Sequence, residues 1–129
     1  MSQPLPLIAV VDDEESVRKA LHRLLRSAGF AVETFPSGAD FLLSFKDHEP
    51  ACVVLDLHMP QINGFEVQAA LESAGGRVPV VIVTGHDTPE ARARVMAHGA
   101  SGYLRKPVDD LMLLAAINAA IGGTPATRA

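Results

Sequence analysis

Five short apolar segments that alternate with stretches of helical periodicity constrain the fold of this chain more than any other feature. Three of these segments, LIAVV, CVVL and VVIV, are apolar throughout, as is typical of strands buried on both faces of a sheet. The AVETF segment alternates between apolar and polar residues, which favours a strand at the sheet edge. We therefore expect β-strands at Leu7–Val11, Ala31–Phe35, Cys52–Leu55, Val80–Val83 and Gly102–Leu104.

Helix signals fill the intervals between these segments. The first helical stretch carries apolar residues at helical spacing between Val17 and Ala28, and Gly29 is placed as its C-terminal stop. The second helix should open at Ser37, with Asp40 three residues later as its capping-box partner. Both signals are local, so each places one end of a helix.

The remaining helices complete a repeating pattern of strand and helix. One runs from about Gly64 to Ser73, and the next opens with a Thr88 cap and Pro89 and ends near Gly99. The last spans roughly Asp109–Ile121. Strand–helix repeats predict a parallel sheet with helices on both faces. In a chain of 129 residues, the leading topology is a doubly wound α/β fold, flavodoxin-like (βα)5, with five strands in the order 2-1-3-4-5.

The fold should occupy residues 7–121 as a single domain, with a short lead at 1–6 and a flexible tail or linker start at 122–129. A net charge of −4 argues against direct contact with nucleic acid. The single cysteine, Cys52, lies in an apolar strand and should be a buried, unreactive thiol. The N-terminal apolar run stops at Asp12 without a preceding charged region, so we expect no signal peptide, no membrane contact and a cytoplasmic location.

Four consecutive acids, Asp12 to Glu15, directly follow the first expected strand. Two like charges about 4 Å apart near a protein surface repel by roughly 4 kcal/mol. Acids are tolerated at the positive end of a helix dipole, and they are also tolerated where a cation lies among them. The local sequence leaves both explanations open.

Other polar residues follow the remaining strands in the same way. Asp56 follows the third strand, Thr84 the fourth, and Lys106 with Pro107 the fifth. In a doubly wound sheet the carboxyl ends of the strands form one edge, where ligands bind. Each residue alone has an ordinary explanation, such as a helix cap, a turn or a solvated lysine. Their joint placement at one edge indicates a single site.

This set of groups suits one kind of chemistry. Carboxylates are ligands that magnesium accepts, and a carboxylate can also attack phosphorus to give an aspartyl phosphate. Such a transfer requires neutralisation of charge on the phosphoryl oxygens, which a metal, a lysine and a hydroxyl can share.

The sequence resembles the receiver domain of two-component response regulators, the CheY-like family, and is most similar to its FixJ-like branch. The resemblance covers about Leu7 to Ile121 and is carried by VVDDEE at 10–15, VVLDLHMPQINGFEV at 53–67, VIVTGH at 81–86 and GYLRKP at 102–107. It implies that a sensor histidine kinase phosphorylates Asp56. It also implies that Asp12, Asp13 and Asp56 hold Mg²⁺ together with the backbone carbonyl of His58.

The resemblance assigns further roles at the strand ends. Thr84 and Lys106 bind the phosphoryl group, Tyr103 moves with Thr84, and the peptide bond before Pro107 is cis. Phosphorylation then changes a face formed by the fourth helix, fifth strand and fifth helix, which drives homodimerisation or release of an output domain. The domain catalyses only its own phosphorylation and dephosphorylation, so it is not an enzyme in the usual sense.

The histidines divide into two groups. His58 and His86 each lie two residues after a site residue, at positions where the family varies and where the lifetime of the phosphorylated state is tuned. The other three lack metal-ligand spacing and are expected at the surface: His22, His48 and His98.

Three alternatives share parts of this pattern. A flavin-phosphate binder has the same architecture, but the acidic first loop would repel the phosphate. A magnesium-dependent phosphohydrolase with an aspartyl phosphate would require an acid/base carboxylate two residues after Asp56, where His58 stands. A protein-interaction module that is never phosphorylated would have no use for the assembled site.

Overall fold

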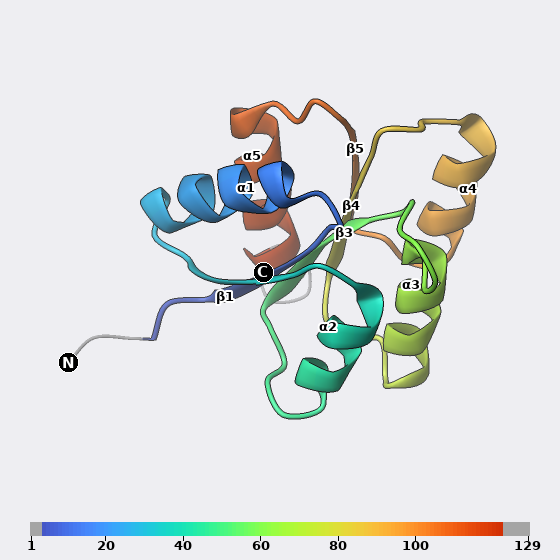
Figure 1. Cartoon of the computed structure of the whole chain (residues 1–129), viewed down its shortest axis with the longest axis horizontal. Helices are drawn as coiled ribbons and strands as arrows, with labels where there is room; N and C mark the ends of the chain where they lie inside the picture. Colours follow the sequence, from blue (N-terminus) through green and yellow to red (C-terminus); the bar gives the residue numbers. More distant parts are fainter. Residues whose placement is uncertain (1–3, 123–129) are drawn as a thin grey trace, which may run out of the picture.

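The strand–helix alternation is present in the computed structural model, which describes residues 4–122 (Figure 1). The strands are β1 (Leu7–Val11), β2 (Ala31–Phe35), β3 (Cys52–Asp56), β4 (Val80–Thr84) and β5 (Gly102–Arg105). The helices are α1 (Glu15–Ser27), α2 (Gly38–Phe45), α3 (Gly64–Ser73), α4 (Pro89–Ala97) and α5 (Asp110–Gly122). None of these helices is long and apolar enough to cross a membrane.

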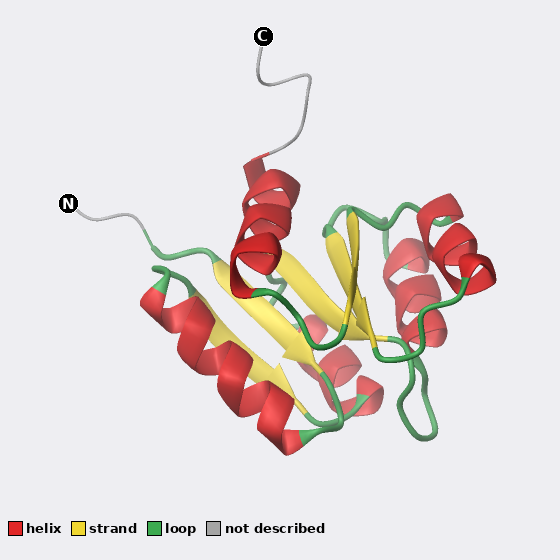
Figure 2. Ribbon diagram, turned by 90° about the horizontal axis from the view of Figure 1, so that it is seen from above, coloured by secondary structure: helices red, strands yellow, loops and turns green. Residues whose placement is uncertain are grey.

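All strand pairs are parallel, and the order is β2-β1-β3-β4-β5, so the predicted topology is confirmed. Helices α1 and α5 cover one face of the sheet, and α2, α3 and α4 cover the other (Figures 1 and 2). The order makes β1 and β3 neighbours, with Val11 beside Leu55 at their carboxyl ends. The residues that follow these two strands therefore lie side by side.

The central strands separate two apolar cores, as their unbroken apolar sequences predicted. Alternate residues of β1 point to opposite faces, so Ile8 packs with α1 and α5 while Ala9 packs with α2, α3 and α4. Strand β2 is only half-buried along its length, which fits its edge position. Cys52 is fully buried, and burial raises the pKa of its thiol to about 12, so it is an unreactive core residue.

Helix starts follow their local signals with one exception. Ser37 Oγ accepts a hydrogen bond from the Asp40 amide at 3.1 Å, but Asp40 does not return one, so the expected capping box is only half formed. The aspartate side chain is one methylene shorter than the glutamate usual at this position. The complete capping box is at α3, where Asn63 and Glu66 bond reciprocally at 2.9 and 2.8 Å. Thr88 caps α4 as predicted.

Some boundaries differ from the sequence prediction. Strands β3, β4 and β5 each extend one residue further than predicted. Asp56 still pairs with Val83 of β4, and Thr84 pairs with Arg105 of β5. Helix α5 begins at Asp110 and includes Gly122, which the prediction had assigned to the tail. The rest of the expected tail, 123–129, lies outside the described residues, as do residues 1–3 of the lead.

Gly64 at the start of α3 allows the helix to approach the end of β3 closely. A Cβ added to Gly64 would lie 2.7 Å from Leu57 Cα and closer still to the backbone oxygen of Asp56. Gly64→Ala should therefore lower the free energy of unfolding by about 1–3 kcal/mol, measured by urea denaturation. Gly102→Ala is the control, since its nearest neighbours would be at 3.6 Å. Equal stability of Gly64→Ala and the native protein would contradict this packing.

Candidate functional site at the carboxyl ends of the strands

The polar residues singled out in the sequence meet at one edge of the sheet. Asp12 and Asp13 follow β1, and Asp56 is the last residue of β3. One oxygen from each of these three carboxylates lies within 4.8 Å of the others. Two further strands contribute to the same edge: Thr84 is the last residue of β4, and Lys106 directly follows β5.

Two of the three carboxylates are buried. Asp12 is 1% exposed and Asp56 is 3% exposed, whereas Asp13 faces solvent. Burial and the nearby charge of Asp12 raise the pKa of Asp56, while the Lys106 ammonium and the His58 amide lower it; the net result is a pKa of about 6. The site therefore holds negative charge that the surrounding protein only partly compensates.

One oxygen of Asp12 is left without a hydrogen-bond partner. Its Oδ1 accepts the amide of Glu14 at 2.9 Å. Its Oδ2 is 2.9 Å from the Lys106 ammonium but accepts no hydrogen bond from any described residue. A buried carboxylate oxygen that accepts no hydrogen bond and lies beside two further carboxylates is a suitable environment for a divalent cation with oxygen ligands. The donor set therefore fits Mg²⁺.

Lys106 is the only lysine or arginine with described ion pairs to these buried acids. Its ammonium lies 2.8 Å from Glu14 Oε1, 2.9 Å from Asp12 and 3.6 Å from Asp56. Burial would lower the pKa of Lys106, but the hydrogen bond to Glu14 and the charges of Asp12 and Asp56 outweigh burial and raise it above its ordinary value. The same hydrogen bond lowers the pKa of Glu14. The lysine is therefore held in its charged form.

Glu14 was not predicted to belong to the site. In the sequence it is one of the four consecutive acids, Asp12 to Glu15, for which a helix start and a cation site were both open explanations. It is the N-cap residue of α1, but its side chain makes no hydrogen bond to that helix and instead accepts one from Lys106. A signal was available, because glutamate is not among the residues that favour the N-cap position.

Thr84 and Tyr103 lie on the neighbouring strands β4 and β5. Thr84 is fully buried, and its hydroxyl oxygen accepts the amide of His86 at 3.0 Å. Tyr103 is half-buried; its hydroxyl donates to Asp87 Oδ1 at 2.8 Å, and the Arg92 guanidinium is 5.3 Å from the ring centroid. The sequence interpretation did not identify Asp87 or Arg92 as partners of this ring.

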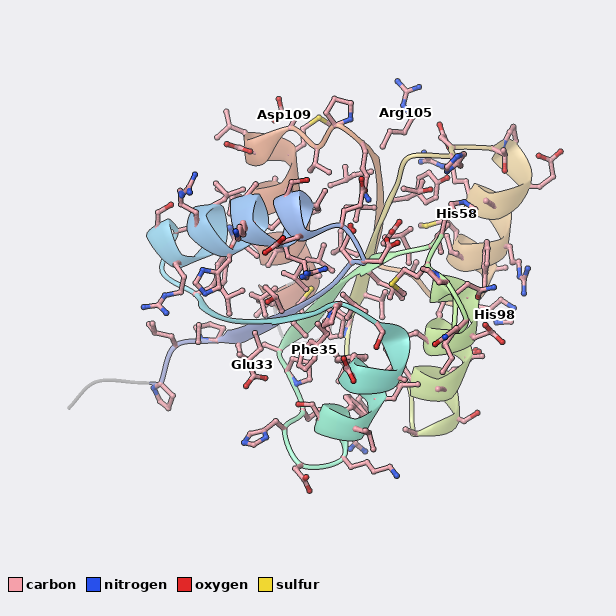
Figure 3. All side chains as sticks on the ribbon, viewed as in Figure 1. Glu33, Phe35, His58, His98, Arg105 and Asp109 are labelled. Carbon is pink, nitrogen blue, oxygen red and sulfur yellow. The ribbon has the colours of Figure 1, made fainter. Side chains whose placement is uncertain are left out.

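The histidines beside the site form an exposed pair. The rings of His58 and His86 meet edge to face with centroids 4.8 Å apart. Figure 3 shows His58 beside α4, and His98 beside α3. His98 Nδ1 lies 3.1 Å from Glu72, and His22 and His48 are exposed. The Lys106–Pro107 peptide bond is cis, in agreement with the expectation from the sequence.

Known proteins are similar to this chain in sequence and in fold. The sequence model described as the response regulator receiver domain matches residues 8–118. The transcriptional regulatory protein FixJ of Azorhizobium caulinodans is 37% identical over 122 residues, which are 95% of this chain and 57% of that protein. The chain thus spans little more than half the length of this relative.

Solved structures agree with the sequence comparison. A response regulator receiver protein from Burkholderia phymatum is 45% identical with a TM-score of 0.81, over 91% of this chain and 95% of that chain. The chemotaxis protein CheY4 of Vibrio cholerae is 29% identical with a TM-score of 0.83, over 90% and 98% of the two chains. On the strength of the matched family model and these relatives, the chain belongs to the response regulator receiver domain family.

Proposed function

We propose that this receiver domain accepts a phosphoryl group on Asp56 from a sensor histidine kinase, and that the modification switches the face formed by α4, β5 and α5. The observation that carries the proposal is the convergence of Asp12, Asp13 and Asp56 beside the Lys106 ammonium. Of the three carboxylates, Asp56 is the one that ends a central strand, and Thr84 ends the neighbouring strand β4.

The transfer requires an ionised nucleophile and neutralised phosphoryl oxygens. An Asp56 oxygen forms a bond to phosphorus as the bond from phosphorus to the donor nitrogen breaks, and the electron pair leaves with the donor. The Lys106 ammonium and the Thr84 hydroxyl bind oxygens of the transferred group. Mg²⁺, held by Asp12, Asp13, Asp56 and the carbonyl of His58, would supply further positive charge to those oxygens.

Protonation of Asp56 should control this reaction. The pKa of about 6 leaves the carboxylate largely ionised at neutral pH, so the nucleophile is available. The phosphohydrolase alternative gains no support from the site, because the exposed His58 stands where its acid/base carboxylate would be required.

The switch starts at the Thr84 hydroxyl. Its oxygen already accepts the His86 amide, so its proton is free to be donated to a phosphoryl oxygen. The hydrogen bond from Thr84 to the phosphoryl group would draw the β4–α4 loop toward Asp56. Asp87, the hydrogen-bond partner of Tyr103, would move with this loop. Moving a two-state equilibrium from 1:99 to 99:1 requires about 5.5 kcal/mol, and one charge-assisted hydrogen bond supplies about 1.5–3 kcal/mol. Lys106 and partner binding should therefore contribute the rest.

The regulated partner is proposed from the length of the relatives. The chain spans 57% of FixJ from A. caulinodans and 50% of the transcriptional regulatory protein TdiR from Thauera aromatica. The switched face would act in homodimerisation or in contact with an output domain of the same regulator. We expect this domain itself to act in the cytoplasm without binding DNA.

Asp56 should be the only phosphorylated residue. Incubation with acetyl phosphate and Mg²⁺ should add one phosphoryl group to the native protein and none to Asp56→Asn, measured by intact-protein mass spectrometry. Asp40→Asn, which changes an exposed acid on α2, should be labelled like the native protein. Equal labelling of Asp56→Asn would contradict the assignment.

The ionised carboxylate of Asp56 should lower the free energy of unfolding at pH values above its pKa of about 6. Folding raises its pKa from 3.8 to about 6, so ionisation of Asp56 disfavours the folded state increasingly between about pH 4 and 6. Asp56→Asn should therefore increase the free energy of unfolding at pH 8 by at most about 3 kcal/mol, which is seen as a higher melting temperature. Near pH 4 the melting temperature should be unchanged. Mg²⁺ should stabilise the native protein at pH 8 more than the variant. A variant less stable than the native protein at pH 8 would refute the repulsion.

Thr84→Ala should separate phosphorylation from switching. The chain has one tyrosine and no tryptophan, so its intrinsic fluorescence reports Tyr103. The variant should still accept a phosphoryl group, but its fluorescence should respond weakly to beryllofluoride and Mg²⁺ because the hydroxyl that moves the loop is absent. Thr34→Ala on the edge strand β2 is the matched control and should respond fully. A full response from Thr84→Ala would show that the signal follows another route.

A further inference from the structure

The Lys106 ammonium lies closer to Glu14 than to Asp56, the proposed phosphorylation site. The ammonium lies 2.8 Å from Glu14 Oε1, as a hydrogen bond, and 3.6 Å from Asp56 Oδ2. The lysine side chain is 15% exposed, whereas that of Glu14 is 57% exposed. The ammonium therefore bridges the buried acids and a carboxylate at the solvent-exposed rim of the site.

The backbone of Glu14 is fixed relative to the site, and its side chain has no other described partner. The Glu14 amide donates to Asp12 Oδ1 at 2.9 Å. The N-cap side chains of α2, α3 and α4 each accept a hydrogen bond from their own helix, but Glu14 at the start of α1 does not. The adjacent Glu15 points elsewhere, to Lys19 at 3.3 Å.

The partners of Lys106 differ in what happens to them when the site is loaded. Asp12 and Asp56 belong to the carboxylate cluster that fits a divalent cation, so a bound cation would compete with the ammonium for their charge. Glu14 is not part of that cluster and would keep its full attraction for the lysine. With the cation bound, a phosphoryl group on Asp56 would then compete for the ammonium chiefly with Glu14.

We propose that Glu14 is a positioning residue for Lys106, an inference that rests on the proposed function: its carboxylate holds the ammonium at the rim until the phosphoryl group on Asp56 draws it inward. Glu14 and the phosphoryl group compete for the Lys106 ammonium. Glu14 therefore lowers the affinity of the site for the phosphoryl group and sets how readily the domain is switched.

Beryllofluoride, an analogue of the phosphoryl group, provides the test without turnover. In the presence of Mg²⁺, Glu14→Gln should bind beryllofluoride between about twofold and tenfold more tightly than the native protein, measured by ¹⁹F NMR titration. Glu15→Gln removes the same charge at the adjacent position without touching Lys106, and it should bind like the native protein. This control separates competition for Lys106 from the general effect of one fewer negative charge.

A second pair of variants tests whether Glu14 acts through Lys106. Lys106→Met should weaken binding, and adding Glu14→Gln to it should bring no further change, since the cation for which Glu14 competes is absent. If Glu14→Gln leaves the affinity for beryllofluoride unchanged, or raises it equally with and without Lys106, the role of Glu14 is wrong. The proposed function would not be affected by that result. A native protein that fails to bind beryllofluoride would overturn the proposed function and the inference with it.

Discussion

Repulsion between the carboxylates that end two adjacent parallel strands is the interaction on which the rest of this structure depends. The strand order places β1 beside β3, so Asp12 and Asp56 cannot move apart without breaking the centre of the sheet. Both side chains are buried, and Lys106 offsets only part of their charge. The fold thus maintains a site whose charge favours cations and requires a charged partner for any phosphoryl group that enters.

In the proposed switch, the element that responds to the site is α4, which buries fewer residues than the other helices. Helix α4 buries one residue, Val95, whereas α1 and α5 bury two each. Its far end is tied to α3 by Gln68, whose amide donates to the Val95 carbonyl at 3.0 Å, and by the hydrogen bond between His98 Nδ1 and Glu72 at 3.1 Å. Its near end follows the loop that carries Asp87, the partner of Tyr103. A small shift at Thr84 can therefore move one end of α4 while the central strands stay in place.

Sequence reasoning succeeded where the signal is local or repeats. Unbroken apolar runs identified the central strands, and topology then placed Asp12, Asp56 and Lys106 at one edge. It failed for contacts between long side chains: the Lys106–Glu14 pair spans 92 positions, and no periodicity encodes it. The Asn63–Glu66 capping box was missed although its spacing was readable. The arrangement of Tyr103, Asp87 and Arg92 depends on the loop geometry after β4, which the sequence pattern does not specify.

A crystal structure of the protein with Mg²⁺ and beryllofluoride tests the central claim most directly. The account predicts beryllium on an Asp56 oxygen, Mg²⁺ coordinated within the cluster of Asp12, Asp13 and Asp56, and the Lys106 ammonium on a fluoride rather than on Glu14. Beryllofluoride on another residue, or Mg²⁺ bound away from these three carboxylates, would contradict it.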